Sequence, residues 1–207
     1  MKIIDVSWPI SAVMTEYKNK PVVCMDYIKT FGKDGVRESV FRLSTHTGTH
    51  VDAPSHFLRD GLTIDQIDLN RCFGSCIVVD CTTVEEAVTA EDLENIAIEK
   101  GDIVLLKTTN SALEATASFD PYFVYLHVSG ALYLAEKGIK AVGIDYLGIE
   151  HSQEGHLTHH ELFKHDVVII EGLRLGHVEP GRYIFSCFPL DLVGTESAPA
   201  RAVLFEE

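Results

Sequence analysis

The sequence predicts an α/β fold that forms one domain over residues 1–207. Short apolar runs of strand length alternate with two helical segments, an order typical of α/β domains with some parallel strand pairing. The chain has no internal repeat, low-complexity tract or evident linker, and its 46% hydrophobic content is that of a globular protein. A length of 207 residues is enough for a substantial core.

The first half of the chain is expected to be mostly strand and loop. Residues 1–10 are predicted to form a strand, and residues 11–30 an irregular polar segment. A turn cluster at residues 31–35 leads into a strand-like pattern over residues 36–44. The apolar run at residues 75–80 predicts a buried strand.

Two helices are expected after residue 88. Thr89, followed by acidic residues, is typical of a helix N-cap, and this helix is expected to run to about Lys100 before Gly101 ends it. A second helix is expected over residues 129–137, before Gly138. Strands are expected at residues 102–107, 140–145, 167–170, 183–189 and 200–205, with a loop over residues 194–199.

Charge and hydropathy exclude several classes of partner. The formal net charge of -14 argues against binding to nucleic acid or to anionic membrane surfaces. No apolar run reaches the length of about 18 residues that a membrane-spanning helix needs. The first apolar stretch is short and meets Asp5 at once, unlike a signal peptide, so we expect a cytoplasmic protein.

The most informative stretch is His46-Thr47-Gly48-Thr49-His50-Val51-Asp52-Ala53-Pro54-Ser55-His56. It places three histidines and an aspartate within eleven positions, and imidazole and carboxylate groups are ligands of Zn²⁺ and similar ions. A lone histidine is usually a satisfied polar residue or a surface residue. Three histidines and an aspartate around a glycine and a proline favour a metal or catalytic site.

The spacing of this stretch requires a bend if His46 and His50 are to share one ion. The run is a poor helix because it contains a glycine, a valine, two threonines and a proline. Fully extended, the two histidines would lie about 13 Å apart, at about 3.3 Å per residue. Gly48 is the residue that permits a bend. Beyond it, His50 and Asp52 share one face of an extended segment, and the proline leaves His56 free to point back.

A second group of histidines lies between residues 151 and 165, shortly before Glu171. The composition of this segment is also typical of a solvated His-rich loop. Glu171 follows the apolar run at residues 167–170 directly, at the carboxyl end of a strand, where ligand groups of α/β sheets gather. The alternative is that Glu171 simply ends the strand in solvent.

The string HTGTHVDAPSH resembles the signature of the cyclase-like metal-dependent hydrolases, a family that includes bacterial kynurenine formamidases and isatin hydrolases. The resemblance implies their swivelling β/β/α arrangement, a mixed sheet with flanking helices. In that family the first two histidines and the aspartate bind metal, and the last histidine is the general acid/base. Carried over, these roles imply metal ligands His46, His50 and Asp52 and a catalytic His56.

The same resemblance selects among the later histidines. Formamidases have a histidine twelve residues before a glutamate, in a pattern like HH…EGL, which here indicates His159 and Glu171 as ligands. His160 is the alternative if the register differs by one. The remaining histidines are then loop residues or orienting partners of a ligand, namely His151, His156 and His165.

The family pattern further implies two divalent ions, zinc most readily and manganese as the alternative. Asp52 and Glu171 would bridge them, with His46 and His50 on one ion and His159 on the other. Such ions lower the pKa of bound water to about 7 for attack on a carbonyl. A general acid/base with a pKa near 6.5 can then pass the proton to the leaving nitrogen.

The implied reaction is that of an arylformamidase, which converts N-formylkynurenine to kynurenine and formate in tryptophan catabolism. The resemblance also implies a homodimer or a higher oligomer. Formamidases have an aromatic residue followed by Pro-Gly-Asp near position 17, but here Lys18-Asn19-Lys20 follows Tyr17. Tyr17 either stacks on the aryl ring of a small-molecule amide substrate or is an exposed loop residue.

Two other functions stay open. A cyclic amide hydrolase of the isatin hydrolase type would use the same chemistry on another substrate. A metal-binding module without catalysis would use the ions for stability alone, and then removal of the His56 imidazole would change no measurable property.

Overall fold

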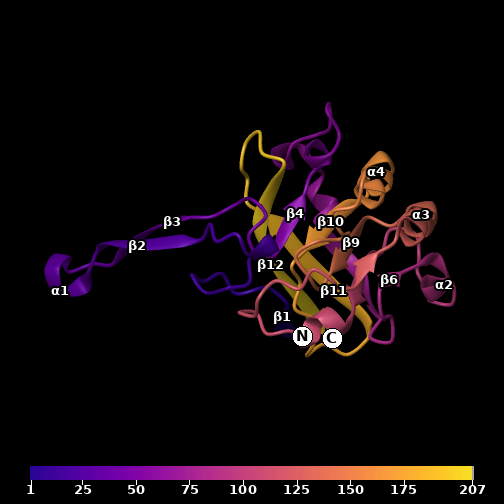
Figure 1. Ribbon diagram of the computed structural model, residues 1–207, viewed down its shortest axis with the longest axis horizontal. Helices are drawn as coiled ribbons and strands as arrows, with labels where there is room; N and C mark the ends of the chain where they lie inside the picture. The colour runs from indigo at the N-terminus through magenta and orange to yellow at the C-terminus, as the bar shows by residue number, and fades with distance from the viewer. Residues whose placement is uncertain (207) are drawn as a thin grey trace.

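The computed structural model describes residues 1–206, and a single large mixed sheet dominates it (Figure 1). Hydrogen-bonded neighbours follow the order β1 (Lys2–Asp5), β12 (Ser197–Glu206), β11 (Gly181–Pro189), β5 (Phe73–Asp80), β7 (Ile103–Lys107), β9 (Ala141–Ile144), β10 (Val168–Glu171) and β4 (His50–Asp52). Strand β4 also pairs with β12, so seven strands close into a ring and β1 lies outside it. The predicted α/β class with a mixed sheet is confirmed.

Parallel pairing is confined to the centre of the sheet. Strands β5, β7, β9 and β10 run parallel, whereas β1, β4, β11 and β12 pair antiparallel with their neighbours. Parallel strands are usually covered on both faces, and β7 is accordingly apolar throughout Ile103–Leu106. Ile103 and Leu105 join the core inside the ring, while Val104 and Leu106 join the core beneath the helices.

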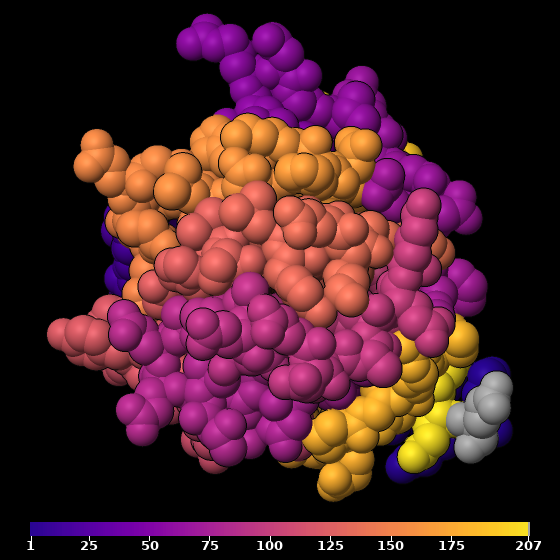
Figure 2. All heavy atoms as spheres, turned by 90° about the vertical axis from the view of Figure 1, so that its right-hand side faces the viewer, coloured from indigo at the N-terminus to yellow at the C-terminus, as the bar shows by residue number. Residues whose placement is uncertain are grey.

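Three helices cover one face of the sheet and lie side by side (Figure 2). They are α2 (Ala90–Leu93), α3 (Val128–Lys137) and α4 (Leu157–Lys164). Helix α3 ends at Gly138, which is left-handed, as expected. A two-stranded parallel sheet, β6 (Ala87–Val88) and β8 (Tyr125–Leu126), lies near them, and the 3₁₀ turns are Tyr17–Asn19, Pro54–His56, Ile64–Gln66, Leu69–Cys72 and Thr109–Ala112.

One helix expectation was wrong, and one alternative interpretation also fails. The capping box of Thr89 starts α2 as predicted, but the helix ends at Leu93 rather than near Lys100. Ile96 and Ile98 both pack on the core beneath the helices, and residues two apart point in opposite directions on a helix, so the chain leaves the helical path. The segment considered as a solvated His-rich loop contains α4 instead, whose buried residues are Thr158, His159, Leu162 and Phe163.

Two strand expectations also need correction, because each strand is recognised only together with the strand that pairs with it. Residues 194–199 were expected to be loop, but β12 begins at Ser197 and pairs there with β4. Residues 11–30 were expected to be irregular, but Cys24–Lys29 forms strand β2, which pairs with β3 (Glu38–Arg42).

The β2–β3 hairpin extends far from the rest of the molecule (Figure 1). The turn cluster at its tip forms one helical turn, α1 (Phe31–Asp34), which ends at a left-handed Gly35. Every residue of β2 and β3 is exposed. We call residues 24–42 the arm. Among residues 1–206, no helix has the length and apolar character needed to cross a membrane.

Candidate metal centre

Strand pairing brings the two predicted ligand segments together where the ring closes. Strand β4 lies between β10 and β12, with His50 opposite Glu171 on one side and Pro199 on the other. Asp52 is two residues further along β4, so it lies on the same face as His50, as predicted. Residues separated by more than a hundred positions therefore share one site because their strands are hydrogen-bonded neighbours.

A bend before β4 brings His46 back over His50. Gly48 is left-handed, with φ of 63°, and the His46 and His50 ring centroids lie 5.0 Å apart. This confirms the bend expected at Gly48. Gly172 crosses it closely: a Cβ at residue 172 would lie 2.2 Å from the carbonyl oxygen of Gly48. The hydroxyl of Thr49 donates to the Gly172 carbonyl and fixes the crossing.

Five predicted ligands converge, with the two carboxylates between the imidazoles. Asp52 Oδ1 lies 3.1 Å from His46 Nδ1 and 3.5 Å from His50 Nε2, and Asp52 Oδ2 lies 3.8 Å from His159 Nε2. Glu171 Oε2 lies 3.3 Å from His50 Nε2, and Glu171 Oε1 lies 3.6 Å from His159 Nε2. Each carboxylate thus faces His50 with one oxygen and His159 with the other.

These contacts fit a divalent ion better than a set of hydrogen bonds. His50 Nε2 and both Asp52 oxygens are buried and have no hydrogen-bond partner among residues 1–206. Unpaired buried polar atoms are rare in proteins and point to a missing partner. Two ligand atoms about 2.1 Å from a tetrahedral ion lie about 3.4 Å apart. The separations of Asp52 and Glu171 from the His50 nitrogen, 3.5 and 3.3 Å, are close to that value.

The second nitrogen of each of these histidines faces an oxygen. His50 Nδ1 lies 2.8 Å from the carbonyl of Gly48, His46 Nε2 lies 3.3 Å from a Glu196 carboxylate oxygen, and His159 Nδ1 lies 2.5 Å from Glu150 Oε1. Such partners fix the orientation of a ligating ring. Neither Glu150 nor Glu196 was predicted as part of the site. Glu150 stood in the His-rich segment, but no sequence signal links Glu196 to His46.

The neighbouring histidines of α4 differ in burial and in the groups that they face. His159 is buried and its Nε2 faces Asp52 and Glu171. His160 is the next residue of α4 and is half-buried, with its ring near Phe57. His151 stacks on Tyr125, and His165 contacts the carbonyl of Glu161, so neither points to the cluster.

The carboxylates control the protonation of the cluster. Burial alone lowers the pKa of His46, but the contact with Asp52 and the charges of Asp52, Glu171 and Glu196 raise it to about 9. Burial also opposes charge on His159, yet Asp52, Glu150 and Glu171 raise its pKa well above the usual value. The pKa of Asp52 is lowered by the surrounding imidazoles despite burial. Without a metal ion, the site therefore holds protons at neutral pH.

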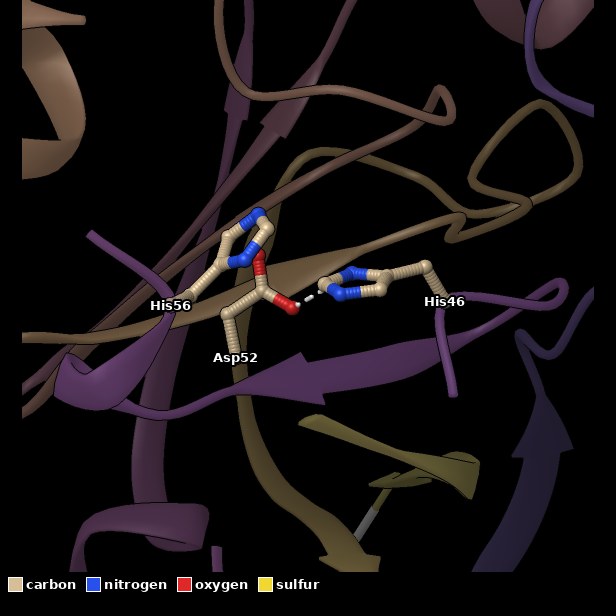
Figure 3. A group of neighbouring side chains, drawn as sticks. All are labelled: His46, Asp52 and His56. Atoms are coloured by element: carbon tan, nitrogen blue, oxygen red, sulfur yellow. Dashed lines mark ion pairs between the residues drawn. The ribbon is translucent and has the colours of Figure 1, made fainter. Parts of the chain in front are cut away.

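His56 lies beside the cluster without an ion pair of its own. Figure 3 shows the His46 and His56 rings on two sides of the Asp52 carboxylate. The His56 ring centroid lies 4.4 Å from that of His46 and 5.9 Å from that of His159. Burial lowers the pKa of His56, and the positive charges of His46 and His159 act in the same direction. At neutral pH this imidazole is therefore free to accept a proton.

A cavity of about 410 Å³ opens onto the cluster, and its lining includes His46, His56, His159 and Glu171. Its apolar wall includes Met14, Val22, Phe57 and Leu147. Tyr17 also lines the cavity, and its hydroxyl lies 2.8 Å from the Ser152 hydroxyl across it. The cavity is of the size that small-molecule sites usually have.

Known proteins share both the sequence and the fold. A family model described as "Putative cyclase" matches residues 4–151. Cyclase-like protein 1 of Arabidopsis thaliana is 38% identical over 177 residues, covering 81% of this chain and 69% of that protein. A kynurenine formamidase of Bacillus anthracis is 30% identical over 205 residues, covering 98% of this chain and 97% of that protein.

A solved structure described as a potential metal-dependent hydrolase with cyclase activity is 45% identical to this chain. It superposes with a TM-score of 0.90, covering 100% of this chain and 98% of that one. The family match, the two relatives and the shared fold agree with the resemblance expected from HTGTHVDAPSH, and this chain belongs to the putative cyclase family.

Proposed function

We propose that this protein is a metal-dependent hydrolase of amide C–N bonds. One observation carries the proposal: the unpaired, buried ligand atoms of His50 and Asp52 adjoin Glu171, which lines a cavity together with His56. A closed ligand set would serve structure alone, whereas an adjacent free acid/base and a cavity serve chemistry. The relative named kynurenine formamidase and the structure described as a metal-dependent hydrolase support the same reading.

The ligand set supports two divalent ions, with zinc or manganese suited to imidazole and carboxylate donors. His46 and His50 would hold one ion and His159 the other, and Asp52 and Glu171 would bridge them. This division is supported because each carboxylate faces both His50 and His159. When bound, such ions supply Lewis acidity that polarises a carbonyl and acidifies water.

The protein's own residues would handle the substrate and the proton. His56, with its lowered pKa, is neutral at pH 7 and would take a proton from water and deliver it to the leaving nitrogen. The apolar wall of the cavity would hold the non-reacting part of the substrate and exclude water. Tyr17 would stack on an aryl ring there.

An arylformamide such as N-formylkynurenine is the substrate class that we propose first. Its hydrolysis yields formate and an aryl amine, here kynurenine, which would place the reaction in tryptophan catabolism. The full-length match to a kynurenine formamidase supports this choice. A cyclic amide of the isatin type is the second candidate, favoured by the Lys18-Asn19-Lys20 segment that replaces the formamidase pattern.

Purified protein, stripped of metal and reloaded with zinc or manganese, would be assayed on N-formylkynurenine and on isatin. We expect turnover of N-formylkynurenine that disappears with a chelator, and elemental analysis should give two ions per chain. Turnover of isatin alone would replace the formamidase assignment with the cyclic amide one. A fully loaded protein that hydrolyses no amide would leave the non-catalytic metal-binding module.

We also infer a homodimer or higher homo-oligomer, formed through the arm. A two-stranded hairpin is marginal in water by itself. The arm nevertheless exposes seven large apolar side chains, Met25, Tyr27, Ile28, Phe31, Val36, Val40 and Phe41. The arm has four basic and three acidic residues, a net charge of +1, against -15 for the rest of the chain. A second copy offers the complementary acidic surface, and two-fold symmetry lets each copy give and receive an arm.

Two further expectations are proposals of the same kind. We infer that residues 1–207 form one domain, and the pairing of β1 with β12 supports it by joining both ends of the chain to one sheet. A cytoplasmic location is in keeping with a small-molecule hydrolase and with the free cysteines at Cys24, Cys72, Cys76, Cys81 and Cys187.

A further inference from the structure

Glu150 is a buried carboxylate beside the cluster, outside the predicted ligand set. Its exposed fraction is 3%, and it accepts three hydrogen bonds. His159 Nδ1 donates to Oε1 at 2.5 Å, the Thr158 backbone N–H donates to Oε2 at 3.1 Å, and His156 Nδ1 lies 3.2 Å from Oε1. A buried carboxylate in such a position needs a specific reason, because its desolvation is unfavourable unless its oxygens are paired.

The hydrogen bond from His159 determines which nitrogen of that ring is free. When the ring carries a single proton, Glu150 holds that proton on Nδ1, so the Nε2 atom keeps its lone pair and faces Asp52 and Glu171. The opposite tautomer would place a proton on Nε2 and could not bind an ion there.

The second oxygen of Glu150 holds the helix that carries His159. Thr158 lies in the first turn of α4, where backbone N–H groups have no partner within the helix. The carboxylate therefore fixes both the ring and the start of the helix. The preceding residue acts on the other ligand, since the Ile149 N–H donates to Glu171 Oε1 at 2.6 Å. Two consecutive residues thus position His159 and Glu171.

We propose that Glu150 is a positioning residue, which holds His159 in the Nδ1–H tautomer and aims its Nε2 at the second metal position. The proposal rests on the ligand set of the proposed function, but it requires no particular substrate. The group of Glu150, His156 and His159 is then an orienting contact and not a metal site. The side of the His159 ring that faces Glu150 carries a proton and no metal ion.

Substitution of Glu150 by glutamine separates this role from simple packing. Glutamine has nearly the same shape but one acceptor oxygen. If that oxygen faces His159, the amide NH₂ meets the Thr158 N–H, and two donors clash. If the amide is flipped, its NH₂ faces Nδ1 and favours a proton on Nε2. Both arrangements should weaken metal binding at the second position, where His159 is the proposed ligand.

The test compares Glu150→Gln with Asp145→Asn, a matched control. Asp145 is equally buried and accepts hydrogen bonds from Thr108, Ser111 and Asn110, away from the cluster. Zinc affinity is measured by competition with a chelator, without any substrate. Loss of such an orienting partner typically weakens metal binding about 10–100-fold, so we expect that loss for one of two ions in Glu150→Gln. Asp145→Asn should bind both ions as the unaltered protein does, even if it melts earlier.

Nitrogen-15 NMR of the zinc-loaded, unaltered protein tests the tautomer directly and does not depend on whether a variant folds. The His159 signals would be assigned by their loss in His159→Gln. We expect a proton on Nδ1 and a zinc-bound Nε2. Zinc on Nδ1, or unchanged affinity of both ions in Glu150→Gln, would overturn the proposal. A protein that binds two ions in this way but hydrolyses no amide would overturn the proposed function and leave Glu150 in its role.

Discussion

The arm and the closure, where β4 joins the ring, both depart from the usual distribution of polar and apolar side chains. They do so in opposite ways. The arm exposes apolar residues such as Phe41, at 60% exposure, whereas the closure buries Asp52 at 1%. Buried polar groups and exposed apolar patches are the informative departures in a folded protein. The proposed partners would remove both departures: cations would pair the buried ligands at the closure, and a second copy would cover the apolar side chains of the arm.

The two regions also differ in how many neighbouring strands hold them in place. Backbone pairing with β10 and β12 holds β4 on both edges, so the closure is set before any ion binds. The arm has only its own two strands. We therefore expect changes at the closure to affect metal and catalysis but not association, and changes in the arm to do the reverse.

The largest effect should come from Asp52→Ala, which removes a carboxylate that faces both His50 and His159. We expect loss of both ions and of all turnover, while the arm still holds the oligomer together. Elemental analysis and light scattering on the same sample check this. An Asp52→Ala protein that keeps two ions would show that the bridging assignment is wrong.

His56→Ala should retain the ions but lose turnover. Removal of a general acid/base typically lowers kcat by about 10²–10⁴-fold. Because the pKa of His56 is lowered, kcat/KM of the unaltered enzyme should stay constant down to about pH 6.5 and fall only at lower pH. Equal turnover of His56→Ala and the unaltered protein, at equal metal content, would remove the acid/base role that we assign to His56.

Metal affinity should increase with pH over the range in which His46 loses its proton. The carboxylates raise the His46 pKa to about 9 despite burial, so below pH 9 an incoming ion must displace a proton. Affinity should rise about tenfold per pH unit for each proton released. In the metal-free protein the protonated form of His46 contributes stability that is complete below pH 6.5 and lost as pH rises through 9.

The stabilisation that metal adds should therefore grow between pH 6.5 and pH 9. Thermal melting with and without zinc across this range measures it. If the difference in melting temperature with and without zinc became smaller as the pH rises, protonation of the metal-free cluster would be contradicted.

The smallest effect on the metal centre should come from the arm. Met25 and Phe41 face each other across β2 and β3, so we expect Met25→Lys with Phe41→Lys to release monomers while zinc affinity stays unchanged. Tyr122→Lys is the control, because Tyr122 is 84% exposed but lies outside the arm. Light scattering gives the mass of each. A monomeric unaltered protein would remove the role that we assign to the arm.

The sequence predicted the parts of the site that depend on local spacing. The two-residue step from His50 to Asp52 and the bend at Gly48 follow from backbone geometry alone, and both are present. The choice of His159 over His160 came from family resemblance, because neighbouring helix positions look alike without a known helix. The structure places His159 on the buried face of α4.

What the sequence did not reveal depends on contacts between distant segments. Glu196 reaches His46 because β12 starts earlier than its apolar run suggests, and Ser197–Pro199 look like loop until β4 is known to lie beside them. Glu150 was hidden among other polar residues of a segment that resembled a loop. Within residues 1–206, strand β2 pairs with β3 alone, and its exposed positions give no buried pattern to detect.

The pairing of β4, the strand that closes the ring, also bears on when the protein can bind cations during its synthesis. Its pairing partners lie at residues 168–171 and 197–199, more than a hundred positions after β4 itself. A nascent polypeptide synthesised only to residue 190 holds every predicted ligand, yet lacks one of the two edges that grip the short segment bearing His50 and Asp52. Cation uptake should accordingly follow the synthesis of β12 and its pairing with β4.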